Sequence, residues 1–265
     1  MKLKLIAAAA LLAATGAANA AIDNGVGGNG ELFFTAWDGA SSYTYDLNTT
    51  IDAFQSSVAA VGAGTYVNAT LDALFTTYLS TANLSSLVWN IVAVDAQAAR
   101  RVIDTYSSLP INAVAADQTR NAITATQSFI GAVNNGIAAQ GNGNSAVFAI
   151  NTPGYANNTT GVRFGNNNGG SAQFSINNTG TIANNTYADG LGMVLIGAAN
   201  SGISATTFSP ISDEGFAVRA YLDTVTGTVA ISGFTTPVPE PETYAMLLAG
   251  LGLMGAIARR RRNRA

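Results

Sequence analysis

The stretch FAVRAYLD at residues 216–223 decides the fold class, because its side chains alternate between two faces. A period of two residues is that of a β-strand with one buried face. Residues 224–227 end in glycine and predict a turn, and residues 228–231 predict the returning strand of a hairpin. This stretch therefore predicts antiparallel β-structure. The face expected to be buried carries Phe216, Val218, Ala220 and Leu222.

More short strands are predicted upstream of this hairpin. The Asp-Gly pair at residues 38–39 predicts a turn between strands at 32–37 and 43–45. Residues 134–185 contain 14 asparagines and 9 glycines, a density that predicts repeated turns between short strands. A disordered low-complexity segment is the alternative for this region. The other predicted strands are 87–95, 101–106, 146–150, 161–164, 173–176 and 193–196.

Three stretches have the apolar spacing of helices. The third, residues 116–137, has Asp117 near its start and Gly141 just beyond its end. We therefore predict a mostly β fold with an α portion: an antiparallel β-sandwich or barrel-like sheet packed by two or three helices. The first stretch carries Ile51, Phe54, Val58 and Val61 on one face. The second, for which Asn68 or Thr70 is the expected cap, carries Leu71, Leu74, Phe75, Tyr78 and Leu79.

The N-terminus has the pattern of a secretory signal peptide. Lys2 and Lys4 supply positive charge, residues 5–14 are apolar, and Ala18 and Ala20 form a small-x-small cleavage site. We expect residues 1–20 to be removed and the exported domain to span residues 21–234. An uncleaved N-terminal anchor is the alternative.

The C-terminus has three ordered parts. A linker at residues 235–242 contains Pro239, Glu240 and Pro241, and it is followed by an apolar run at residues 243–258. The run is 16 residues long, which as a helix reaches about 24 Å, nearly the thickness of a hydrocarbon core. We predict a single transmembrane helix here. The basic tail at residues 259–265 should stay cytoplasmic through Arg259, Arg260, Arg261 and Arg262, leaving the domain outside.

These three parts together resemble a PEP-CTERM sorting signal. The resemblance implies an exported protein of a Gram-negative bacterium that makes extracellular polysaccharide. It also implies processing by an exosortase, a membrane-embedded cysteine transpeptidase that cleaves near the Pro-Glu-Pro motif. The chain would be held at the inner membrane by its C-terminal helix and would then reach the cell surface or the extracellular matrix. The resemblance covers the tail alone and implies no fold or activity for the domain.

Composition narrows the partners and the chemistry of the domain. Residues 21–238 contain five arginines, no lysine and 13 acidic residues, a formal charge of −8. Such a surface disfavours nucleic acid and other polyanions, and tolerates cations and neutral sugars better. The chain has no cysteine and no histidine, which excludes Ser-His-Asp and Cys-His nucleophiles, thiolate metal sites and histidine-bearing zinc sites. Carboxylate chemistry and oxygen-bound calcium remain.

Several residues are candidates for chemistry, each with a structural alternative. Asp213, Glu214, Asp189 and Asp223 could form a calcium site or a glycosidase pair, although adjacent carboxylates before a glycine are more often an exposed turn. An aromatic platform for sugars would use Trp37, Trp89, Tyr43, Tyr45 and Tyr66, for which core packing is the alternative. The Asn-x-Ser/Thr sites are Asn48, Asn68, Asn83, Asn157, Asn158, Asn177 and Asn184.

We therefore expect an exosortase-sorted surface or matrix protein with a structural or adhesive role, without catalysis, cofactor or metal. The alternative is a carbohydrate-binding β-sandwich that recognises a neutral extracellular polysaccharide. An enzyme using a carboxylate pair ranks third.

Overall fold

The structure, a computed structural model, describes residues 21–61, 64–97, 100–108, 116–156, 178–197, 207–213 and 216–233. These residues belong to a compact unit that ends at Gly233. The signal peptide, the linker, the apolar run and the basic tail lie outside the described residues, as do the strands expected at 161–164 and 173–176.

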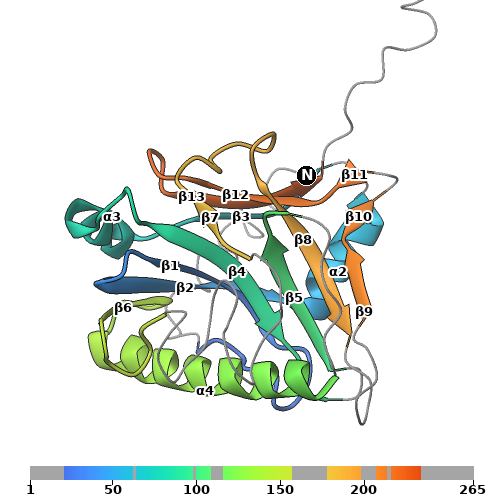
Figure 1. The fold of residues 1–265 in the computed structure, drawn as a ribbon, viewed down its shortest axis with the longest axis horizontal. Helices are drawn as coiled ribbons and strands as arrows, with labels where there is room; N and C mark the ends of the chain where they lie inside the picture. Colours follow the sequence, from blue (N-terminus) through green and yellow to red (C-terminus); the bar gives the residue numbers. More distant parts are fainter. Residues whose placement is uncertain are drawn as a thin grey trace, which may run out of the picture. The chain divides into compact units, whose positions relative to one another are not determined.

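One antiparallel sheet organises the described unit (Figure 1). Its main strand order is β3-β13-β12-β8-β5-β4-β1-β2-β6, with β7 paired to β4 and β9 paired to β8. A separate two-stranded sheet joins β10 to β11. The strands are β1 (Glu31–Trp37), β2 (Ser41–Thr50), β3 (Gly64–Thr70), β4 (Val88–Val94), β5 (Arg101–Tyr106), β6 (Ser145–Ala149), β7 (Gly180–Thr181), β8 (Leu191–Gly197), β9 (Thr207–Pro210), β10 (Ser212–Asp213), β11 (Phe216–Ala217), β12 (Arg219–Asp223) and β13 (Thr228–Gly233).

The three described helices form where the apolar spacing predicted them. They are α2 (Ile51–Val61), α3 (Ala73–Thr81) and α4 (Ala116–Gln140). The cap predicted for α3 was wrong: Asn68 and Thr70 lie in β3, and Asp72 caps the helix by accepting a hydrogen bond from the backbone N–H of Phe75. Gly141 follows α4 with a φ of 68°, a left-handed conformation that glycine adopts without strain.

The sheet buries side chains on both faces, because successive residues of a strand point to opposite sides. What we call the inner face packs against α2 and α3, and its core includes Phe34, Trp89, Phe54 and Phe75. What we call the α4 face packs against α4, and its core includes Phe33 and Phe129. Figure 1 shows α4 at the bottom of the view, below the sheet, and the helix contacts β6 and β4.

The fold class is confirmed in its barrel-like form and not as a sandwich. One sheet curls so far that β2 and β3, which are distant in strand order, come into contact. A sandwich would need a second layer of strands to cover the hydrophobic faces, and here helices cover them instead. Among the described residues, no helix is long and apolar enough to cross a membrane.

The strand predicted at 216–223 is interrupted at Val218. The backbone N–H of Val218 donates to the carbonyl of Ile211, and its own carbonyl accepts from the N–H of Met193. The chain therefore changes partner at this residue, with β11 pairing to β10 and β12 pairing to β13 and β8. Alternation predicted the buried side of Val218, Ala220 and Leu222 but not this change of partner.

Candidate functional site

The sorting residues Pro239, Glu240 and Pro241 and the arginines 259–262 follow a firmly held strand. Strand β13 pairs with β12 on one side and with β3 on the other, and it ends at Gly233. Those sorting residues and the cleavage-site residues Ala18 and Ala20 lie outside the described part of the chain. The structure therefore describes the last strand before the sorting tail, which is β13.

Two of the predicted carboxylate candidates, Asp223 and Asp189, accept hydrogen bonds within the turns in which they lie. The carboxylate of Asp223 accepts hydrogen bonds from the backbone of Val225 and Thr226 and from the Thr226 hydroxyl, which lowers the pKa of Asp223. Asp189 accepts from the hydroxyl of Thr186 in the turn that contains both. Asp213 lies in β10, and Glu214 is outside the described residues. Within the described ranges, no group of three or more acidic residues could hold a metal ion.

The predicted aromatic platform is wrong for three of its five members. Trp37, Trp89 and Tyr43 are buried in the two cores and are not available for stacking on a sugar. They are buried because strands β1, β2 and β4 have both faces covered. Tyr45 and Tyr66 are half-buried against the inner core.

Those aromatic side chains instead form a packed cluster on the inner face. The Phe34 ring lies 6.0 Å from Trp89 and 6.1 Å from Phe75, centroid to centroid, with the Phe75 ring edge-on. Burial raises the pKa of Tyr43 above its ordinary value, and its hydroxyl donates to the carboxylate of Asp72 at 3.0 Å. The same carboxylate caps α3, so the cap and the aromatic cluster are one assembly.

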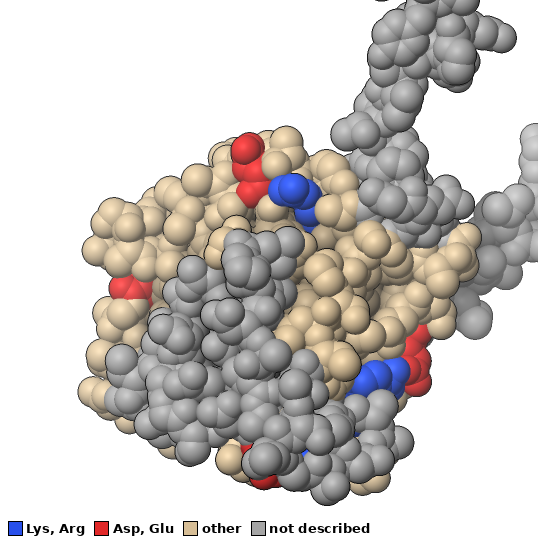
Figure 2. All heavy atoms as spheres, turned by 45° about the vertical axis from the view of Figure 1, so that its right-hand side comes forward, with Lys and Arg blue, Asp and Glu red and all other residues tan. Residues whose placement is uncertain are grey.

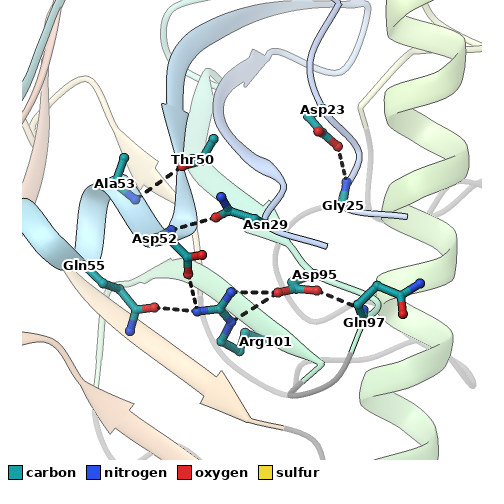
Figure 3. A network of polar contacts seen from close by, with 10 residues as sticks. All are labelled: Asp23, Gly25, Asn29, Thr50, Asp52, Ala53, Gln55, Asp95, Gln97 and Arg101. Carbon is teal, nitrogen blue, oxygen red and sulfur yellow. Dashed lines mark hydrogen bonds and ion pairs between the residues drawn. The ribbon is translucent and has the colours of Figure 1, made fainter. Parts of the chain in front are cut away.

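An ion-pair network that the sequence did not reveal joins three parts of the chain (Figure 3). The Arg101 guanidinium binds the Asp95 carboxylate through two nitrogens, at 2.8 and 3.2 Å. It also donates to Asp52 at 2.7 Å and to Gln55 at 3.0 Å, both from α2. The Asp95 side chain is only 6 % exposed, so its charge is balanced inside the protein. This arrangement ties α2 to the β4–β5 connection.

A row of buried polar side chains crosses the α4 face. Thr44 of β2, Thr35 of β1 and Asn90 of β4 lie opposite one another across the strands. The hydroxyls of Thr35 and Thr44 are 3.2 Å apart and share a hydrogen bond. Asp104 of β5 lies on the same face, opposite Val92, two residues from Asn90.

The row ends where β5 separates from β4 and β7 takes its place. Here the side-chain N–H of Asn178 donates to the Asp104 carboxylate at 2.9 Å. The backbone carbonyl of Asn178 accepts from the Thr105 hydroxyl at 2.7 Å. Burial raises the pKa of Asp104 well above its ordinary value. Among the described residues, Oδ1 of Asp104, Oδ1 of Asn178 and both polar atoms of the Asn90 amide have no hydrogen-bond partner.

The surface of the described unit carries few charges. Figure 2 shows one face on which most of the described surface is uncharged, with a few acidic and basic residues, some of them side by side. Three of the predicted Asn-x-Ser/Thr sites, Asn48, Asn68 and Asn83, are exposed, and Asn184 is half-buried. Asn157, Asn158 and Asn177 lie outside the described residues.

The comparison with family models supports the sorting signal predicted at the C-terminus. The family model described as the PEP-CTERM protein-sorting motif matches residues 237–262. The chain carries a PEP-CTERM sorting signal. It is therefore an exported protein of the kind that exosortase sorts to the surface. No curated protein and no solved structure matched the chain.

Sequence reasoning missed the Arg101 network and the buried polar row for different reasons. Arg101 begins the predicted strand 101–106 and Asp95 ends the predicted strand 87–95, so two opposite charges at the adjoining ends of these strands could have suggested the pair. No such signal exists for Asn90 and Asp104, since a polar residue within a strand usually marks the solvent side.

Proposed function

We propose that this protein is a non-catalytic structural or adhesive component of the cell surface or extracellular matrix of a Gram-negative bacterium. Its signal peptide directs export, and the apolar run at residues 243–258 holds the chain in the inner membrane. Cleavage by exosortase near residues 239–241 then releases or transfers the domain. The mechanism is passive.

The observation that carries this proposal is the position of the sorting signal next to an interior strand. The matched motif begins at residue 237, and β13 ends at residue 233 with partners on both sides. A strand held on two sides resists separation from the domain better than a loop or an edge strand, because both ladders must break. This suits a domain that stays attached through its C-terminal end.

The chemistry of the described residues also supports a passive role. Asp189 and Asp223 bind the turns in which they lie, and Asp52 and Asp95 bind Arg101. Groups held in this way are supporting parts of the fold. The face in Figure 2 carries few charges, which suits contact with neutral matrix material, and the net negative charge of the domain disfavours polyanions.

The carbohydrate-binding alternative loses its main support. Its expected aromatic platform has Trp37, Trp89 and Tyr43 in the core, which leaves the uncharged surface as the argument for it. We therefore rank it second, with a neutral polysaccharide as its ligand.

The test is a replacement experiment in the native host. A strain lacking the protein receives the wild type, a variant with Pro239, Glu240 and Pro241 all changed to Ala, or a control with Thr235→Ala and Thr236→Ala just outside the matched motif. We expect the wild type and the control to restore surface-bound protein and cell aggregation. The motif variant should remain in the inner membrane with its tail intact by mass.

Two results would contradict the proposal. Unchanged aggregation and matrix cohesion in the deletion strain would rule out the structural or adhesive role, even if sorting were normal. Binding of purified residues 21–238 to a neutral glycan on an array, at low micromolar affinity, would favour the carbohydrate-binding alternative instead.

A further inference from the structure

The first residues of the expected mature chain are locked under α4. Ile22 is 1 % exposed and packs in the core of the α4 face. The side-chain amide of Asn134 binds both backbone polar groups of Ile22: the Ile22 N–H donates to Oδ1 at 2.9 Å, and Nδ2 donates to the Ile22 carbonyl at 3.0 Å. Asn134 thus holds Ile22 as a neighbouring strand would.

The contacts continue along the following residues. Gln127, seven positions before Asn134 and so on the same side of α4, donates to the carbonyl of Asn24 at 3.1 Å. The carbonyl of Gly25 accepts from the N–H of Ala96 at 3.0 Å. A side chain at Gly25 would place its Cβ 2.0 Å from the Val94 carbonyl oxygen, so only glycine permits this approach. Figure 3 shows this segment beside the Arg101 network.

This lock lies almost at the bond that signal peptidase is expected to cut. The predicted cleavage site places Ala20 before the bond and Ala21 after it, so a single residue separates the bond from Ile22. Proteases bind the residues on both sides of a scissile bond as an extended strand, through the backbone N–H and C=O groups. Ile22 cannot offer these groups to a protease while Asn134 holds both of them.

We propose that signal-peptide cleavage and the docking of Ile22 on α4 exclude each other, so that Asn134 acts as a lock that must still be open when the precursor is cut. Hydrolysis of the bond adds one water, leaving a carboxylate on Ala20 and an amino group on Ala21. The newly freed end then docks under α4. A precursor that docks Ile22 first resists cleavage and stays anchored at its N-terminus. The proposal rests on the predicted signal peptide and is independent of exosortase sorting.

The experiment measures the rate at which purified signal peptidase releases residues 1–20 from the folded full-length precursor in detergent. A synthetic peptide of residues 1–30 gives the rate without the lock. We expect the folded wild type to be cut much more slowly than the peptide. Asn134→Ala should accelerate cleavage of the folded precursor about tenfold or more, because it removes two partly buried hydrogen bonds to Ile22.

The matched control is Asn135→Ala, the same substitution at the next position of α4, where the side chain is exposed. It should leave the cleavage rate unchanged. If Asn134→Ala fails to fold, Gln127→Ala tests the same segment through its bond to Asn24, with a smaller acceleration expected. Equal rates for the folded wild type and the peptide would overturn the proposal. The proposal would also be overturned if signal peptidase failed to cut the synthetic peptide. That result would contradict the predicted signal peptide but would not affect the sorting signal at the C-terminus.

Discussion

The two faces of the sheet are built from different kinds of side chain. The inner face is lined by large apolar and aromatic residues, with Phe34, Trp89 and Phe75 in ring contact. The α4 face combines an apolar core around Phe33 and Phe129 with a row of buried polar groups that includes Thr35, Asn90 and Asp104. The same strands supply both faces, residue by residue.

This difference indicates which face supplies the stability of the domain and which face makes that stability depend on pH. Packed aromatic rings contribute transfer free energy and ring–ring contacts that do not depend on pH. A buried carboxyl group contributes in a way that changes with its protonation. We therefore expect the inner face to supply most of the stability and the α4 face to give it a dependence on solution conditions.

The strongest test of this contrast is Phe34→Ala on the inner face. The side chain is fully buried and contacts three other aromatic rings, those of Tyr43, Phe75 and Trp89. We expect the free energy of unfolding to fall by about 3–5 kcal/mol, measured by urea denaturation. Val225→Ala is the control, since Val225 is 93 % exposed and its loss should change stability little. A loss below ~1 kcal/mol at Phe34 would contradict the assignment of stability to this face.

The second test is Arg101→Ala, which removes the partner of the buried Asp95. Losing one partner leaves an uncompensated charge, so the free energy of unfolding should fall by about 3 kcal/mol. Arg101→Lys should recover only part of this, because an ammonium cannot form the two-nitrogen pairing with Asp95. Thermal unfolding of both variants measures the effect. Equal stability of the Lys variant and the wild type would show that charge alone matters here.

The contrast between the faces also explains what the sequence could predict. Local patterns identified β1, β2, β4, β5 and all three described helices, because apolar spacing is set by burial of one face. Strand β3 was missed because its sequence, GTYVNAT, shows no clear alternation. It is a strand through its pairing with β13, a partner more than 150 residues away.

The inner and α4 faces were not equally visible in the sequence. Apolar residues such as Trp89 and Ile91 signal a buried strand, but nothing in the sequence indicates that Asn90 between them is also buried. Asn90 is fully buried on the α4 face, which packs against a helix formed by residues later in the chain. Of the expected aromatic platform, Trp37 is buried on the α4 face, whereas Trp89 and Tyr43 are buried on the inner face.

The third test uses pH to separate the two faces. Burial raises the pKa of Asp46, on the α4 face, to about 7, and it also raises the pKa of Asp104 well above its ordinary value. Because the folded state binds these protons more tightly than the unfolded state, their contribution to stability is greatest below about pH 4 and is lost as pH rises. For Asp46 the loss should be complete near pH 7.

The measurement compares wild type with Asp46→Asn by urea unfolding at several pH values. The amide keeps an oxygen to accept from the Asn48 N–H but cannot ionise. The stability of the variant relative to wild type should therefore rise by ~1–3 kcal/mol between pH 4 and pH 7. Asp223→Asn is the control: the pKa of Asp223 is lowered, so its contribution changes only below about pH 4 and the difference from wild type should stay flat between pH 4 and pH 7. A flat difference for Asp46 would show that folding does not destabilise its carboxylate and would contradict the raised pKa.

The smallest expected effect concerns the edge of the sheet beside α4. The side-chain amide of Gln140 accepts from the N–H of Val147 at 3.1 Å and donates to its carbonyl at 2.8 Å, so it occupies the edge of β6 as another strand would. Gln140→Ala should lower the free energy of unfolding by only about 1 kcal/mol, because water replaces the lost bonds at this exposed position. It should also increase hydrogen exchange at the Val147 amide, measured by NMR, while exchange at Phe34 on the inner face stays unchanged. Equal acceleration at both amides would mean that the two faces open together and that the contrast between them has no energetic meaning.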